Sequence, residues 1–69
     1  MTQITPLQQF AKQLAELRRS KGLSQEELAE RSGLHAIAIT YIETGKRVPR
    51  LDTVFKLAEG LGIEVSELF

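Results

Sequence analysis

Residues 25–44, QEELAERSGLHAIAITYIET, decide how the rest of the chain can be arranged. Ser24 stands immediately before this stretch, and Glu27 follows it three residues later, which is the spacing of a capping box at the start of a helix. Gly33 comes after the last apolar turn, where a residue with positive φ allows a helix to end. The stretch therefore begins with a short helix, expected over residues 25–31, that stops at a glycine turn.

A second helix is expected over residues 36–43, with His35 near its N-terminus. Ile39 and Ile42 are three residues apart and share one face of this helix. The segment AIAITYI is rich in β-branched residues, which favour strands. No other stretch alternates convincingly, so a strand here would lack a partner, and we interpret the segment as helix. Two short helices joined by a tight turn at these offsets predict a helix-turn-helix.

The N-terminal segment predicts a longer helix. Thr5 supplies a capping hydroxyl and Pro6 suits the first helical position, where its missing N–H costs nothing. The helix is expected to continue to about Lys21 and to end at Gly22, and residues 1–5 are expected to be flexible. Its apolar positions recur at helical spacing and are Leu7, Phe10, Ala11, Leu14 and Leu17.

The C-terminal segment predicts two more helical pieces. A helix over about residues 51–61 is expected to stop at Gly62, and residues 64–69 add one short helical turn. The wide apolar face of the longer helix consists of Leu51, Val54, Phe55, Leu57, Ala58 and Leu61. The sequence therefore predicts an all-α fold, a compact five-helix bundle, with one domain over residues 6–69.

Composition limits the classes of function. A chain of 69 residues allows one modest core, and the absence of cysteine and the single histidine argue against a disulfide or a zinc site. We found no nucleophile–base pair and no phosphate-cradling glycine loop, so we expect neither an enzyme nor a small-molecule substrate, cofactor or metal. No apolar run is long enough for a membrane span, which favours a cytoplasmic location.

Charge is balanced but unevenly placed. Nine basic and nine acidic residues give a net charge of zero, whereas DNA-binding domains are usually basic. Basic residues nevertheless gather in two places, at the end of the first helix and after residue 44. These clusters are Arg18, Arg19 and Lys21, and then Lys46, Arg47 and Arg50. The pattern is compatible with one basic face and an acidic back.

Taken in order, these residues resemble the phage-repressor-like helix-turn-helix proteins, which include lambdoid repressors, Cro-like proteins and the controller proteins of restriction–modification systems. The resemblance covers residues 7–69. Its segments are GLSQEELA at 22–29, SGL at 32–34, Ile39, IETGKR at 42–47, Pro49, Leu57-Ala58 and LGI at 61–63. The resemblance implies a lambda-repressor-like DNA-binding domain that regulates transcription on double-stranded DNA.

The family also implies roles for matching positions. The second helix of the motif lies in the major groove, and its outward, base-reading positions here are His35, Ala36, Ile37, Thr40 and Tyr41. Contacts to phosphates are implied for Ser24, Gln25, Thr44, Lys46, Arg47 and Arg50. An ion pair between Arg18 and Glu43 is implied as a structural element.

The base-reading positions depart from the family's usual glutamine, arginine, serine or asparagine. Ala36 and Ile37 can offer only apolar contact, for example to a thymine methyl group. Three explanations are open: an A·T-rich site read through methyl groups and shape, contacts made mostly to the DNA backbone by Tyr41 and the following loop, or a reading surface that has been altered or repurposed so that specific binding is weak.

Two functional hypotheses follow. The first is a transcriptional regulator that binds its operator as a homodimer, because one short helix reads too few base pairs. Apolar residues near the C-terminus are the candidate dimer contacts: Val65, Leu68 and Phe69. Packing of Leu68 and Phe69 within their own chain is the alternative. The second hypothesis is a protein-interaction module with the same fold, such as the antitoxin of a toxin–antitoxin pair.

Overall fold

The computed structural model describes residues 4–69 and contains only helices and connecting segments over that range. Its elements are α1 (Pro6–Ser20), α2 (Gln25–Ser32), α3 (Ala36–Glu43), α4 (Leu51–Leu61) and the 3-10 turn η1 (Val65–Leu68). The predicted all-α class is confirmed. The fifth element is a 3-10 turn and not an α-helix, because its backbone bonds span three residues, as in the 3.0 Å bond from the Glu67 N–H to the Glu64 carbonyl.

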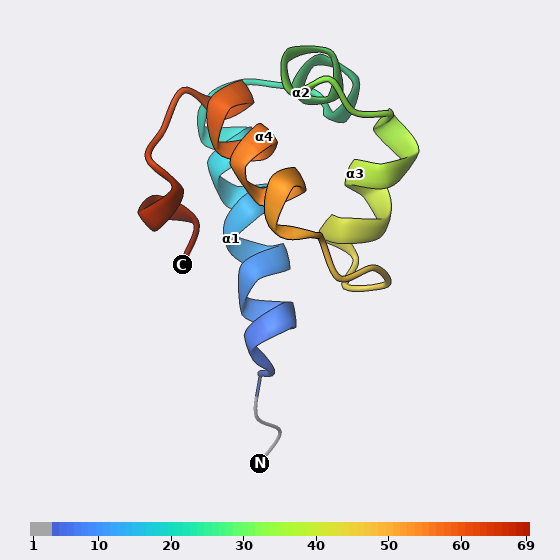
Figure 1. The fold of residues 1–69 in the computed structure, drawn as a ribbon, viewed down its shortest axis with the longest axis vertical. Coiled ribbons are helices and arrows are strands. Elements are labelled where there is room, and N and C mark those ends of the chain that lie inside the picture. The colour runs from blue at the N-terminus through green and yellow to red at the C-terminus, as the bar shows by residue number, and fades with distance from the viewer. Residues whose placement is uncertain (1–3) are drawn as a thin grey trace.

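α3 and the C-terminal turn lie on opposite sides of α4. In Figure 1, α3 lies on the right and the C-terminal turn on the left, with α4 between them. α2 packs against both α3 and α4, while α1 contacts α3 and η1. Residues 1–5 are predicted to be flexible, and residues 1–3 of this segment lie outside the described residues. Thr5 caps α1, as the sequence predicts.

The predicted capping box and turn of the motif are confirmed. The Ser24 hydroxyl accepts a 3.0 Å hydrogen bond from the Glu27 amide, and the Glu27 carboxylate accepts a 2.9 Å bond from the Ser24 amide. The hydrogen bond from the Ser24 backbone amide foremost, and then the Ser24 side chain, holds the pKa of the Glu27 carboxyl below its usual range, so the carboxylate stays ionised at neutral pH. Gly33 ends α2 with φ 69°.

One hydrophobic core joins all five elements. Its fully buried side chains are Leu14, Leu28, Ile39, Ile42, Leu57 and Leu68. The burial of Ile39 and Ile42 explains why α3 is helical despite its β-branched composition, since tertiary packing outweighs a propensity difference of a few tenths of a kcal/mol per residue.

The predicted core face of α4 is too wide. Val54 and Leu57 are buried as expected, but Leu51 is 72% exposed and Phe55 is 54% exposed. The two exposed residues lie four positions apart on a side of α4 that no other described helix covers. Helical periodicity identified the apolar positions correctly, but it assigned Leu51 and Phe55 to the core, and both lie on the surface.

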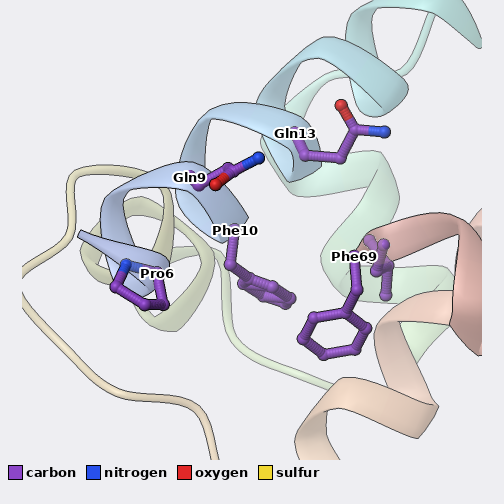
Figure 2. A pocket seen from close by; sticks show the side chains of 6 residues that line it. Pro6, Gln9, Phe10, Gln13 and Phe69 are labelled. Carbon is purple, nitrogen blue, oxygen red and sulfur yellow. The ribbon is translucent and has the colours of Figure 1, made fainter. Parts of the chain in front are cut away.

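The C-terminal residues differ from one another in burial. Leu68 lies entirely inside its own chain's core, so the expectation that it contacts a second copy is corrected: its side chain has no free surface. Val65 packs against the core and is half-buried. Phe69 remains exposed, although its ring faces Phe10 of α1 at a centroid distance of 5.3 Å (Figure 2).

Gly60 lies at a close approach of α4 to α2. It is buried, and a Cβ added there would collide with the Ser32 hydroxyl and lie 3.2 Å from both the Ser32 amide nitrogen and Leu28 Cδ1. The absence of a side chain at Gly60 therefore allows the two helices to pack at this distance.

Replacing this glycine tests the close approach. Gly60→Ala improves helix propensity by about 1 kcal/mol, but the clash with α2 is expected to outweigh that gain. We expect a net loss of about 1 kcal/mol of unfolding free energy, which lowers Tm by about 4–8 °C. Thermal unfolding, monitored by circular dichroism, measures this change in Tm. In a Ser32→Ala background the same change should cost less, and an equal or raised Tm for Gly60→Ala alone would contradict the close approach.

Candidate nucleic-acid interface

α3 presents an apolar, exposed side on the surface of the protein. Ile39 and Ile42 face the core, while Ile37 is 57% exposed and Tyr41 is also exposed. Ile37 and Tyr41 are four residues apart and therefore adjacent on one helix face. His35 is exposed at the N-cap and Ala36 is half-buried beside it. Of the predicted base-reading residues, His35, Ile37 and Tyr41 are therefore exposed at the start and outer side of α3, whereas Ala36 packs partly against the core.

The start of α3 has no side-chain cap. His35 occupies the N-cap position, and its side chain makes no capping hydrogen bond. The first amides of a helix have no partner within the helix, and they carry a partial positive charge. This terminus can therefore receive hydrogen-bond acceptors and negative charge from outside the protein.

Two predicted DNA contacts are used inside the protein. The Thr40 hydroxyl donates a 2.8 Å hydrogen bond to Gln25 Oε1, and Gln25 Nε2 donates a 3.0 Å bond to Glu43. In this structure both side chains are half-buried and tie α2 to α3, and their predicted contacts with DNA stay predictions. The backbone amide of Gln25 still lies at the start of α2.

Arg18 and Glu43 form a two-point ion pair between α1 and α3. Arg18 Nε and Nη2 donate to the two Glu43 oxygens at 2.7 and 3.0 Å, and Nη1 donates to the Leu23 carbonyl at 2.9 Å. The side chains are only 11% and 5% exposed. The hydrogen bonds that Arg18 donates to Glu43 raise the pKa of Arg18 above its already high usual value, so the guanidinium stays charged.

The loop after α3 carries the basic side chains. Arg47 lies over the Tyr41 ring with 5.4 Å between its Cζ atom and the ring centroid, a cation–π distance. The amides of Lys46 and Arg47 donate to the Tyr41 carbonyl at 2.9 and 3.2 Å, which holds the loop against the end of α3. Both side chains are exposed.

The other side chains predicted to contact phosphates make some of their hydrogen bonds or ion pairs within the protein. The Thr44 hydroxyl donates back to the Thr40 carbonyl at 2.8 Å, so only its acceptor lone pairs remain. Arg50 makes a long, exposed 3.4 Å contact with Asp52, which leaves its charge accessible. The Ser24 hydroxyl accepts from the Glu27 amide and keeps its own proton to donate.

A second exposed feature was missed by the sequence reasoning. Val48, Leu51 and Phe69 line a shallow groove of about 400 Å³, and Phe55 lies one turn along α4 from Leu51. We call Val48, Leu51, Phe55 and Phe69 the α4 surface. Besides Phe69, which the sequence predicts as a dimer contact, its sequence signal is an apolar count on α4 larger than one helix face needs. Periodicity cannot distinguish a core face from an interface.

Within residues 4–69, no helix combines the length and apolar character needed to cross a membrane. The same residues contain no cluster of three histidine, cysteine or acidic side chains arranged to hold a metal ion.

Comparison with known protein families identifies the family to which this arrangement of helices belongs. A family model described as helix-turn-helix matches residues 14–68, which include all of α2, α3 and α4. The chain belongs to the helix-turn-helix family. The resemblance seen in the sequence is thereby confirmed, and α2 and α3 are the two helices of its motif.

Among solved structures, this helix-turn-helix chain is similar to the restriction-modification controller protein C.AhdI from Aeromonas hydrophila. The two are 48% identical with a TM-score of 0.89, over 91% of this chain and 96% of that one. The chain is also 43% identical over 61 residues to the control protein C.MunI from Mycoplasma sp, covering 87% of this chain and 82% of that protein.

A longer relative is the transcriptional regulator PuuR from Escherichia coli, which is 45% identical over 58 residues. The match covers 84% of this chain but only 31% of PuuR, so the chain spans less than a third of that regulator. Together the comparisons support a helix-turn-helix transcriptional regulator of the controller or repressor type.

Proposed function

We propose that the chain binds double-stranded operator DNA in a sequence-specific manner and regulates transcription as a homodimer. One observation carries the proposal: α3 has an uncapped N-terminus and an exposed outer face, and the exposed basic side chains of Lys46 and Arg47 follow it directly. A helix in this setting fits the major groove, with its N-terminus toward the bases and the basic loop beside the phosphates.

Local charge, and not net charge, supports this placement. The charge of Glu43, the acidic residue of α3, is balanced by Arg18, and the Gln25 side-chain amide donates a further hydrogen bond to it. Lys46, Arg47 and Arg50 remain accessible, and the Ser24 hydroxyl and the Gln25 backbone amide lie at the start of α2. We assign these groups to phosphates, which contact cations, hydroxyls and helix N-termini.

Arg47→Ala tests the phosphate assignment. Loss of one cation from each copy should weaken binding to all duplexes by a similar factor, because phosphates carry no sequence information. We expect the slope of log K against log salt concentration to become shallower by about 1 for each bound copy. Fluorescence anisotropy with a labelled duplex, repeated over a salt series, measures both quantities.

Lys56→Ala is the matched control, because it removes an exposed positive charge from α4, outside the proposed interface. Its salt slope should equal that of the unmodified chain. Equal slope changes for the two variants would contradict the assignment of Arg47, and binding that does not weaken as salt rises would contradict phosphate contact altogether.

The α4 surface supports dimerisation. It is the exposed apolar area that includes the groove beside α1. Figure 1 shows the C-terminal turn on the far side of α4 from α3. We propose that a second copy covers it, so that two α3 helices enter major grooves about 34 Å apart. Of the C-terminal residues predicted for this contact, Phe69 keeps this role. Acting on DNA, the dimer would work in the cytoplasm.

The same surface is also the observation that favours a protein-interaction module such as an antitoxin, since large exposed apolar areas mark partner sites. The two functions differ in what the purified chain does alone. A regulator of the proposed kind forms a dimer and shifts DNA without help. A chain that stays monomeric, shifts no duplex and co-purifies with a stoichiometric partner protein would select the interaction module.

A further inference from the structure

We propose that Ile37, with Ala36 beside it, recognises the C5-methyl group of a pyrimidine in the major groove. Specificity in each half-site would then depend chiefly on methyl groups and not on hydrogen bonds to base edges. This inference rests on the proposed DNA-binding function, which supplies the groove that α3 enters.

The first step is that α3 offers few free polar groups. The Thr40 hydroxyl is used by Gln25 at 2.8 Å, with the Ala36 carbonyl at 3.2 Å. The Thr44 hydroxyl is used by the Thr40 carbonyl. Neither proton is available to a base. The Gln25 amide, the side chain best suited to paired bonds with adenine, is held by Glu43 and Thr40.

The second step concerns what remains on the outer face. Ile37 is 57% exposed in the first turn of α3, where recognition helices approach the bases. Tyr41, one turn later, has its ring beneath Arg47 and so lies next to the proposed phosphate contact. His35 can supply one hydrogen bond at a time to a base edge, which cannot distinguish the four base pairs as a two-point contact does.

The third step is chemical. An isoleucine side chain has no donor or acceptor, so it cannot use the polar pattern of a base pair. The apolar feature that B-DNA presents in its major groove is the C5-methyl group of thymine. 5-Methylcytosine carries a methyl group at the same ring position. Ile37 would therefore distinguish a methylated pyrimidine from an unmethylated one, whichever base carries the methyl.

The experiment starts from a duplex selected for binding from a randomised pool. Each thymine is replaced singly by deoxyuridine, which removes the methyl group and keeps the base pair. We expect that this replacement at one thymine in each half-site lowers the affinity of the chain for the duplex about fourfold, since a buried methyl contributes about 0.8 kcal/mol. In the Ile37→Ala variant the same replacement should have no further effect. Circular dichroism checks that this exposed substitution leaves the fold intact.

A second set of duplexes separates the two methyl sources. At the sensitive position, C·G should bind weakly and 5-methylcytosine·G should recover about fourfold. Recovery with thymine only would overturn recognition of the methyl group, because it would require a contact to the base edge. The His35→Ala variant should keep the same uracil sensitivity.

Failure of this inference is distinguishable from failure of the proposed function. Duplex binding that weakens with salt but shows no uracil-sensitive position would overturn the role of Ile37 and leave DNA binding standing. Absence of binding to any duplex would overturn both. A sensitivity that persists unchanged in Ile37→Ala would assign the methyl contact to a different residue.

Discussion

Glu43→Ala is expected to lower the free energy of unfolding by about 3 kcal/mol, because removing one member of a buried ion pair leaves the other charge unpaired. Arg18 would keep only the Leu23 carbonyl, and the Gln25 amide would also lose its acceptor. A loss of this size lowers Tm by well over 10 °C in a chain this short. Urea unfolding at constant pH, monitored by circular dichroism, measures the loss of unfolding free energy.

Two controls separate the ion pair from a general effect of losing a glutamate. Glu30→Ala removes an exposed carboxylate from α2 and should change stability by less than about 0.5 kcal/mol. The double variant Arg18→Met with Glu43→Leu removes both charges and should be more stable than Glu43→Ala alone. A Glu43→Ala chain within about 0.5 kcal/mol of the unmodified one would contradict the proposed structural role of the pair.

Leu51→Glu is expected to convert the proposed dimer to a monomer and to weaken the proposed operator binding at least a hundredfold. A carboxylate at the centre of the α4 surface would be buried without a partner on dimerisation. Loss of the second half-site removes the gain of about 10²–10⁴ that linked binding provides. The fold should tolerate the change, because Leu51 is largely exposed at the start of α4, where an acidic residue suits the helix dipole.

The matched control is Ile37→Glu, which places the same charge at an exposed apolar position on α3. This variant should keep the mass of a dimer in sedimentation equilibrium while its DNA binding falls. A Leu51→Glu chain that retains the dimer mass would contradict the assignment of the α4 surface to a second copy.

The local features of the motif could be predicted from the sequence because they depend on neighbours three or four residues apart. The Ser24–Glu27 capping box, the positive φ at Gly33 and the shared face of Ile39 and Ile42 are all of this kind. Their spacing fixes the geometry of each helix end before any tertiary contact forms, and the structure matches them residue by residue.

The features that could not be predicted depend on distances between elements. Gln25 and Thr40 are fifteen residues apart, and only the packing of α2 on α3 brings their side chains into hydrogen-bond contact. The close approach at Gly60 likewise arises from the packing of α4 on α2. Leu51 and Phe55 have the same apolar character as their buried neighbours, and nothing in their spacing shows that no helix of the same chain covers them.

The proposed DNA-binding function is tested most directly by selecting duplexes from a randomised pool with the purified chain and sequencing those that bind. We expect one enriched, two-fold symmetric sequence whose half-site centres lie about 34 Å apart, roughly one helical turn. Its affinity should fall linearly with salt on logarithmic axes. A pool that remains random after repeated selection, or enriched duplexes that bind equally well at every salt concentration, would contradict the function proposed for α3 and its basic loop.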